Sequence, residues 1–155
     1  MKGIGLGFRA AGVADLARIM EIERAGFAHP WSEALLRREF EHAWSRTLVA
    51  VEGAGGGEIV GYVVFWLVHD EVHVLNVGTA PEARRRGIGR ALLEEAAAQG
   101  RRQGARLATL EVRRSNAPAR ALYERLGYRV VGERPNYYAE EKEDAIVMTL
   151  DLDPR

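Results

Sequence analysis

Residues 77–90 read VGTAPEARRRGIGR, an extended stretch that passes through an Arg- and Gly-rich turn into a helix. Gly87 and Gly89 carry no Cβ, so a ligand could approach the backbone N–H groups there closely. The N-terminus of the following helix faces the same point and favours an anion. The spacing is Arg-x-x-Gly-x-Gly rather than the Gly-x-x-x-x-Gly-Lys-Ser/Thr of a nucleotide P-loop, which disfavours an ATP or dinucleotide site. Two interpretations remain open here: an anion cradle, and an ordinary turn with a basic, solvated face.

The apolar pattern on either side of this segment predicts strands and helices in alternation. Strands are expected at 6–9, 46–52, 58–68, 71–79, 106–113, 128–134 and 144–151, and helices at 13–25, from Ser32 to about 43, at 88–103 and at 117–126. This order indicates an α/β fold: a mixed, mostly antiparallel central sheet of about seven strands, with helices on both faces.

The length of 155 residues predicts a single domain over 1–155, large enough to fold without disulfides or a metal. The absence of cysteine excludes disulfides, thiolate metal sites and a cysteine nucleophile. The four histidines lack the spacing of a zinc pair, so no metal is expected. The longest apolar run, 61–68, is far below the ~20 residues of a membrane span, and the first residues lack the apolar stretch of a signal peptide. A cytoplasmic protein is therefore expected.

The 22 basic and 22 acidic residues balance overall but are unevenly distributed. The net charge is −4 over residues 1–83, +8 over 84–134 and −4 over 135–155. A positive middle segment between acidic flanks favours a local anionic ligand over a nucleic-acid surface. For most individual arginines, a solvated helix face is the simpler interpretation.

A second segment, residues 110–128, reads LEVRRSNAPARALYERLGY. Its pattern NxxAxxLYxxxGY, residues 116–128, together with RxxGxG at 84–89, resembles the GNAT acetyltransferase family. Both motifs stand in the family's order, and the order of strands and helices covers essentially the whole chain. The segments PWS (30–32), LEVR (110–113) and NYY (136–138) are similar to the RimI branch, which acetylates the N-terminal alanine of ribosomal small-subunit protein 18 in bacteria.

The resemblance implies an acetyl-CoA site. Backbone groups of Val77, Gly78 and Thr79 are expected to pair with the pantetheine arm like an additional strand. The backbone N–H groups expected to hold the pyrophosphate are those of Arg85, Arg86, Gly87, Ile88, Gly89 and Arg90. The side chain of Asn116 is expected either to contact the cofactor or to cap the helix that follows it.

The resemblance also implies Glu111 as general base and Tyr123 as general acid. A peptide α-amine has a pKa of ~7.7–8.0, so it must lose a proton before it attacks a thioester at neutral pH. Strand alternation places Glu111 on one face, with Leu110 and Val112 on the other. An ion pair for Glu111 and a packing role for Tyr123 are the alternatives. His73 stands where many relatives carry glutamate, and it is a second candidate base, which would make activity follow histidine titration.

Trp31, Tyr137 and Tyr138 are planar groups suited to line a cleft for a peptide, although core packing is an equal alternative for Trp31. The expected reaction is direct attack of a protein N-terminal amine on acetyl-CoA, with no nucleic acid or membrane as partner. An acetyltransferase for a small amine or a lysine side chain is one alternative, and a CoA-binding module without catalysis is another. The sequence does not indicate an oligomeric state.

Overall fold

The computed structural model describes residues 5–53, 57–138 and 143–153, and a single sheet runs through them. Its strands are β1 (Leu6–Ala10), β2 (Ser45–Glu52), β3 (Glu58–Val68), β4 (Glu71–Thr79), β5 (Leu107–Arg113), β6 (Arg129–Tyr138) and β7 (Glu143–Asp151). They are ordered β1-β2-β3-β4-β5-β7-β6. All neighbouring pairs are antiparallel except β4 and β5, which run parallel. The expected mixed, mostly antiparallel sheet of seven strands is confirmed.

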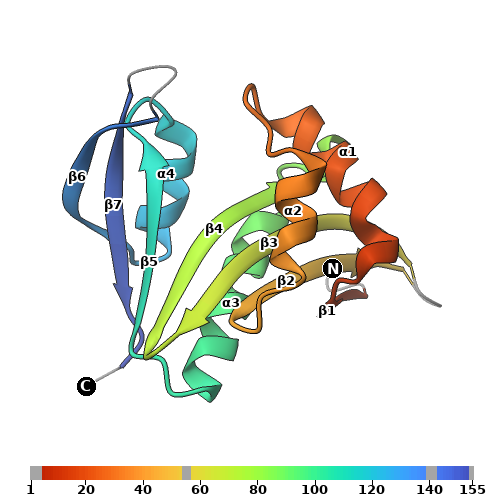
Figure 1. The fold of residues 1–155 in the computed structure, drawn as a ribbon, viewed down its shortest axis with the longest axis horizontal. Helices are drawn as coiled ribbons and strands as arrows, with labels where there is room; N and C mark the ends of the chain where they lie inside the picture. Colours follow the sequence, from red (N-terminus) through yellow and green to blue (C-terminus); the bar gives the residue numbers. More distant parts are fainter. Residues whose placement is uncertain (1–4, 54–56, 139–142, 154–155) are drawn as a thin grey trace.

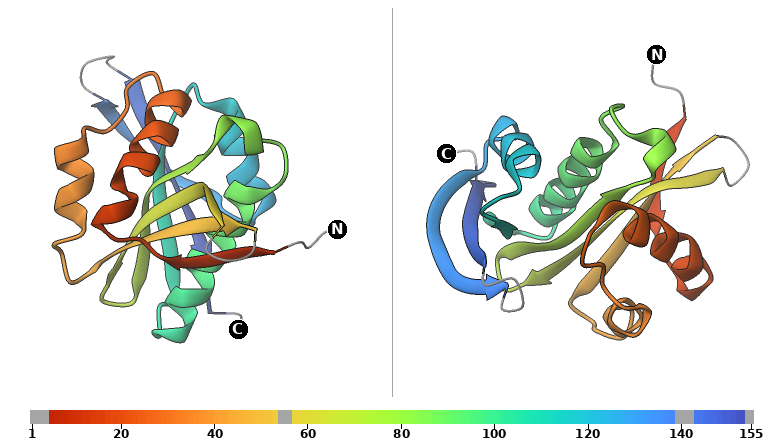
Figure 2. Two further views of the ribbon diagram at one scale, coloured as in Figure 1. Left: turned by 90° about the vertical axis from the view of Figure 1, so that its right-hand side faces the viewer. Right: turned by 90° about the horizontal axis from the view of Figure 1, so that it is seen from above.

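Four α-helices cover the two faces of the sheet: α1 (Leu16–Gly26), α2 (Glu33–Glu39), α3 (Ile88–Arg102) and α4 (Ala117–Arg125). Figure 2 shows α1 and α2 on one face and α3 and α4 on the other. The side chains of β3 are buried over most of its length because helices cover it from both sides. No helix within the described ranges is long and apolar enough to cross a membrane.

Three element boundaries differ from the sequence-based expectation by more than one residue. The first helix is preceded by a 3₁₀ turn at Val13–Asp15, and the next-to-last strand continues to Tyr138. The second helix ends at Glu39 rather than near residue 43. There, Glu39 Oε1 accepts hydrogen bonds from Ser45 Oγ (2.7 Å) and Trp66 Nε1 (2.8 Å), so tertiary contacts with β2 and β3 fix the end of the helix.

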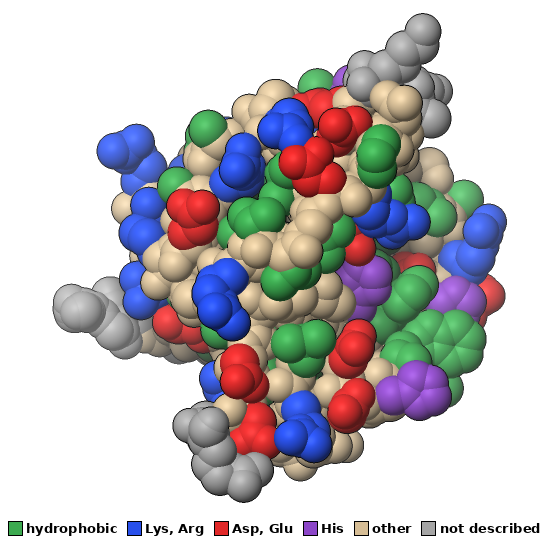
Figure 3. All heavy atoms as spheres, turned by 90° about the vertical axis from the view of Figure 1, so that its left-hand side faces the viewer, with side chains coloured by type: hydrophobic (Ala, Val, Ile, Leu, Met, Phe, Trp, Pro, Cys, Tyr) green, Lys and Arg blue, Asp and Glu red, His purple; other side chains and the backbone are tan. Residues whose placement is uncertain are grey.

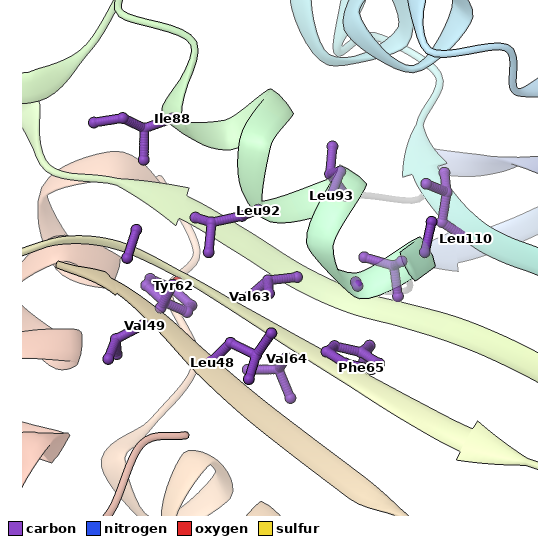
Figure 4. Close-up of a cluster of buried hydrophobic side chains, with 14 of the residues drawn as sticks. Leu48, Val49, Tyr62, Val63, Val64, Phe65, Ile88, Leu92, Leu93 and Leu110 are labelled. Carbon is purple, nitrogen blue, oxygen red and sulfur yellow. The ribbon is translucent and has the colours of Figure 1, made fainter. Parts of the chain in front are cut away.

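The hydrophobic core extends over both faces of the central strands, and α3 covers one of these faces. Figure 4 shows Leu92 of α3 directed toward the central strands, where Tyr62 and Phe65 of β3 are fully buried, and Ile88 and Leu93 of the same helix are buried as well. Burial of this apolar surface is the main favourable contribution to the stability of the fold. The same packing holds the start of α3, and the Arg/Gly-rich turn that precedes it, against the end of β4.

Strands β4 and β5 pair over only four residues of each strand, from Glu71 opposite Leu107 to Val74 opposite Leu110. A β-bulge then occurs at Leu75, because Phe65 of β3 lies opposite Val74, whereas the preceding β3 residue, Val64, already lies opposite Asn76. Beyond this point β4 remains paired with β3, and β5 with β7, so the two strands diverge (Figure 1). An opening is left in the middle of the sheet.

Gly78 lies on β4 at the edge of this opening and directly over Tyr62. A Cβ at position 78 would lie 2.6 Å from Cε1 of the Tyr62 ring, closer than real Cβ contacts allow. Residue 78 must therefore be a glycine, because the Tyr62 ring on the neighbouring strand β3 leaves no room for a Cβ.

The substitution Gly78→Ala is expected to destabilise the protein by ~1–3 kcal/mol, because the new methyl group must displace the Tyr62 ring in a packed core. Thermal unfolding followed by circular dichroism measures this as a lower Tm. Gly132→Ala on β6 is the matched control, since a Cβ there meets nothing within 4 Å. Equal Tm values for the two variants would contradict the packing constraint.

Candidate functional site

A cavity of about 320 Å³ occupies the opening between β4 and β5. It brings together most of the residues that the sequence singled out: Val77, Gly78, Thr79, Gly89, Glu111, Asn116, Tyr123, Trp31 and Tyr138 all line it. These residues come from elements far apart in the chain. The cavity is continuous from the last residues of β4 to the first turns of α3 and α4.

The remaining residues of the expected pyrophosphate cradle lie at the start of α3, outside the cavity lining: Arg85, Arg86, Gly87, Ile88 and Arg90. The Ile88 side chain is buried in the core, and the guanidinium of Arg86 forms an ion pair with Glu52 at 2.9 Å. Gly87 adopts a left-handed φ of 78° and precedes the first turn of α3. The first N–H groups of a helix have no acceptor within the helix, so this end is suited to an anion through its backbone.

Asn116 caps α4, since its Oδ1 accepts a hydrogen bond from the Ala119 N–H at 3.2 Å. The capping interpretation is confirmed, and the same side chain also lines the cavity. Tyr138 lines the cavity as well, and the guanidinium of Arg113 lies 4.0 Å from its ring centroid. Tyr137 differs from its neighbour: it is 43% exposed and lies outside the lining.

Glu111 lies near the end of β5, and its side chain is 14% exposed. Its Oε1 accepts a hydrogen bond from His73 Nε2 on β4 at 2.9 Å, and Arg134 lies 3.7 Å from Oε2. The hydrogen bond from His73 lowers the pKa of Glu111 below its usual value, against the opposing effect of partial burial. Glu111 is therefore ionised at neutral pH. The two candidate bases that the sequence presented as rivals form one hydrogen-bonded pair.

Tyr123 projects from α4 into the same cavity and is 9% exposed. Burial raises its pKa to about 12, and the neighbouring Tyr138 contributes in the same direction. The phenol therefore remains protonated at neutral pH and can donate a hydrogen bond or a proton. The cavity thus combines an ionised carboxylate with a protonated phenol.

The structure shows one buried carboxylate at the cavity that the sequence motifs did not indicate. Glu23 of α1 is 2% exposed and lines the cavity. Its Oε2 accepts a hydrogen bond from the Trp31 N–H (2.8 Å), and its Oε1 accepts from Asn76 Nδ2 (2.8 Å) and from the Tyr62 hydroxyl. Burial raises the pKa of Tyr62, which keeps that hydroxyl available as a donor. Glu23 thereby ties the loop between α1 and α2 to β3 and to the diverging end of β4.

A signal for Glu23 was present in the helical spacing. The buried residues Leu16, Ile19 and Met20 precede it by seven, four and three positions, so Glu23 falls on the apolar face of α1. A glutamate on such a face is almost never left without hydrogen-bond partners.

We expect Glu23→Leu to lower the free energy of unfolding by ~3 kcal/mol or more, because one buried and two partly buried donors lose their acceptor. Urea denaturation monitored by tryptophan fluorescence measures the change. The control is Glu21→Leu on the same helix, whose carboxylate is 66% exposed and whose loss is expected to cost ~0.5 kcal/mol or less. Similar losses for the two variants would show that the buried hydrogen bonds contribute nothing beyond a surface change.

Residues 16–128 match the model of the acetyltransferase (GNAT) family. The putative [ribosomal protein bS18]-alanine N-acetyltransferase of Bacillus subtilis is 33% identical, over 89% of this chain and 90% of its own length. The [ribosomal protein bS18]-alanine N-acetyltransferase of Escherichia coli K12 is 35% identical, over 89% of this chain and 92% of its own.

Solved structures agree with this grouping. The crystal structure of the ribosomal-protein-S18-alanine N-acetyltransferase from E. coli superposes with a TM-score of 0.85 at 32% identity, covering 97% of this chain and 96% of that one. Arabidopsis thaliana NAA60, crystallised in complex with acetyl-CoA, shares the fold with a TM-score of 0.81 at 22% identity, covering 94% of this chain and 98% of that one. The chain therefore belongs to the GNAT family of acetyltransferases, and it is an acetyl-CoA-dependent N-acetyltransferase.

Proposed function

We propose that this chain acetylates the α-amine of a protein N-terminus, namely the N-terminal alanine of ribosomal protein bS18, in the cytoplasm. The observation that carries the proposal is the single cavity between β4 and β5, which is lined by Glu111 and Tyr123 together. The bacterial relatives named for this reaction, which are similar over about nine tenths of both chains, support the choice of acceptor.

Acetyl-CoA is proposed to enter along the diverging end of β4. The edge of Val77, Gly78 and Thr79 that faces away from β3 has no β5 partner, so the pantetheine amides can pair with it as another strand would. Gly89 lies beside this edge, where a Cβ would already be 3.6 Å from Thr79 Oγ1. The pyrophosphate is proposed to bind the N–H groups at the start of α3.

The transfer is proposed to occur in one ternary complex. Glu111 removes a proton from the acceptor ammonium group, and the nitrogen lone pair then attacks the thioester carbonyl carbon. The C–N bond forms, the C–S bond breaks as the tetrahedral intermediate collapses, and the sulfur receives the proton of Tyr123. The nitrogen then releases its extra proton, which restores the phenol of Tyr123 and leaves the neutral amide. The proton then leaves Glu111 for water, and the hydrogen bond from His73 Nε2 (2.9 Å) favours the ionised carboxylate for the next turnover.

Replacing the proposed base tests this scheme directly. Glu111→Gln is expected to lower kcat by ~100-fold or more, because general base catalysis contributes ~10²–10⁴-fold. Tyr123→Phe is also expected to lower kcat, and both variants are expected to retain the affinity for acetyl-CoA, measured by calorimetry. Glu21→Gln is the control with an exposed carboxylate. Unchanged turnover in Glu111→Gln combined with loss in His73→Ala would assign the base to His73 instead.

The acceptor is tested by intact-mass detection of acetylated peptides. A peptide with the N-terminal sequence of bS18 is expected to gain one acetyl group, and the same peptide with a blocked N-terminus is expected to gain none. A blocked peptide that contains lysine and a panel of small amines serve as controls. Transfer only to lysine or to small amines would refute the N-terminal proposal. Binding of acetyl-CoA without transfer to any acceptor would favour a binding module.

A further inference from the structure

A second hollow, of about 700 Å³, lies next to the proposed active site. Its lining comes from the start of β2, the turn between β3 and β4, and the strand residues on either side of that turn: Trp44, Trp66, Val68, His69, Asp70, Glu71 and His73. Trp44 is 45% exposed and Val68 36% exposed. Exposed tryptophan next to other apolar groups in a concave surface is typical of a site that binds another polypeptide.

The hollow adjoins the active-site cavity, because one hydrogen bond joins a residue that lines the hollow to a residue that lines the cavity. His73 lines the hollow, Glu111 lines the cavity, and His73 Nε2 lies 2.9 Å from Glu111 Oε1. The Trp66 ring meets the His73 ring edge-on, with 5.7 Å between the centroids. An acceptor whose terminal nitrogen lies at Glu111 would therefore pass His73 and reach the tryptophans within a few residues, since an extended chain advances ~3.3–3.6 Å per residue.

Two side chains that form the hollow are held in place by the protein. The Trp66 indole N–H donates a hydrogen bond to the buried carboxylate of Glu39 at 2.8 Å. The Trp44 ring stacks on His42, with centroids 4.7 Å apart and planes 8° from parallel. A surface fixed in this way loses little conformational entropy when a ligand binds.

The charge of the hollow favours a cationic ligand. Among its described lining residues, Asp70 and Glu71 are acidic, and none is lysine or arginine. Figure 3 shows hydrophobic and histidine side chains gathered at one edge of this face, with acidic side chains beside them. Opposite charges across an interface favour association and select the partner.

We propose that this hollow binds the residues that follow the acceptor's N-terminal residue and selects acceptors that carry basic and large apolar side chains there. The proposal rests on N-terminal acetylation as the proposed function and adds a specificity site to it. Recognition of the acceptor then extends beyond the amine and includes several residues of the chain.

Two acceptor peptides with the same first three residues test the proposal. The short one ends there, and the long one continues for about seven residues with arginine and phenylalanine. Wild-type enzyme is expected to use the long peptide with the lower KM. Trp44→Ala is expected to raise the KM of the long peptide about tenfold, a loss typical of an exposed aromatic contact residue, and to leave the short peptide unchanged. Val131→Ala on β6, 59% exposed and outside the hollow, is the control.

The charge component is tested with Asp70→Asn/Glu71→Gln. This double variant is expected to raise the KM of the long peptide, and replacing the arginines of that peptide by alanine is expected to abolish the difference from wild type. Smaller salt dependence of KM in the variant would support the same conclusion.

Three results would overturn the proposal. Equal changes with both peptides would make Trp44 a structural residue, and no change with either would exclude contact with the acceptor. A mass that rises with protein concentration in wild type but not in Trp44→Ala, measured by light scattering, would assign the hollow to a second copy of the chain. Failure of wild type to acetylate even the short peptide would instead refute the proposed function.

Discussion

The structure depends on the divergence of β4 and β5 after four paired residues. A parallel pair inside a sheet normally satisfies the backbone groups of both strands along their length. Here the bulge at Leu75 turns β4 away from β5. Beyond this point β5 is paired only with β7, on its other side. The divergence leaves strand edges and a cavity in the interior of the sheet, where a carboxylate from β5 and a phenol from α4 lie together. The opening offers both an unpaired strand edge and a pocket, and the proposed binding of acetyl-CoA uses both.

The divergent end of β4 is held by side chains rather than by a neighbouring strand. Glu23 accepts hydrogen bonds from Asn76, Tyr62 and the backbone of Trp31, and so connects the loop between α1 and α2 to β3 and β4. Tyr62 reaches this carboxylate because Gly78 has no side chain above its ring. A buried carboxylate is tolerated because its hydrogen bonds offset the desolvation of the charge. The two halves of the site are therefore one packed unit.

Much of the fold could be predicted from sequence because strands and helices leave local patterns. The apolar pattern predicted the strands and helices, and the family resemblance carried by residues 84–89 and 116–128 implied residues that line the cavity, among them Glu111 and Tyr123. Contacts between distant segments leave no such pattern. The bond between His73 and Glu111 depends on the register of β4 against β5, the network around Glu23 on packing of α1 against the sheet, and the end of α2 on the contacts of Glu39. The hollow around Trp44 and Trp66 likewise joins strands whose pairing the sequence alone does not define.

Hydrogen exchange with and without CoA, measured by mass spectrometry, tests most directly that the opening between β4 and β5 is the cofactor site. Backbone amides of residues 76–79 and of the start of α3 at 87–90 are predicted to exchange more slowly when CoA is bound. The pantetheine arm is proposed to pair with the first segment, and the pyrophosphate is proposed to bind the N–H groups of the second. The amides around Trp44 and Trp66 are predicted to exchange at the same rate in both states. Protection that falls on those tryptophans, or on neither segment of the opening, would contradict the assignment.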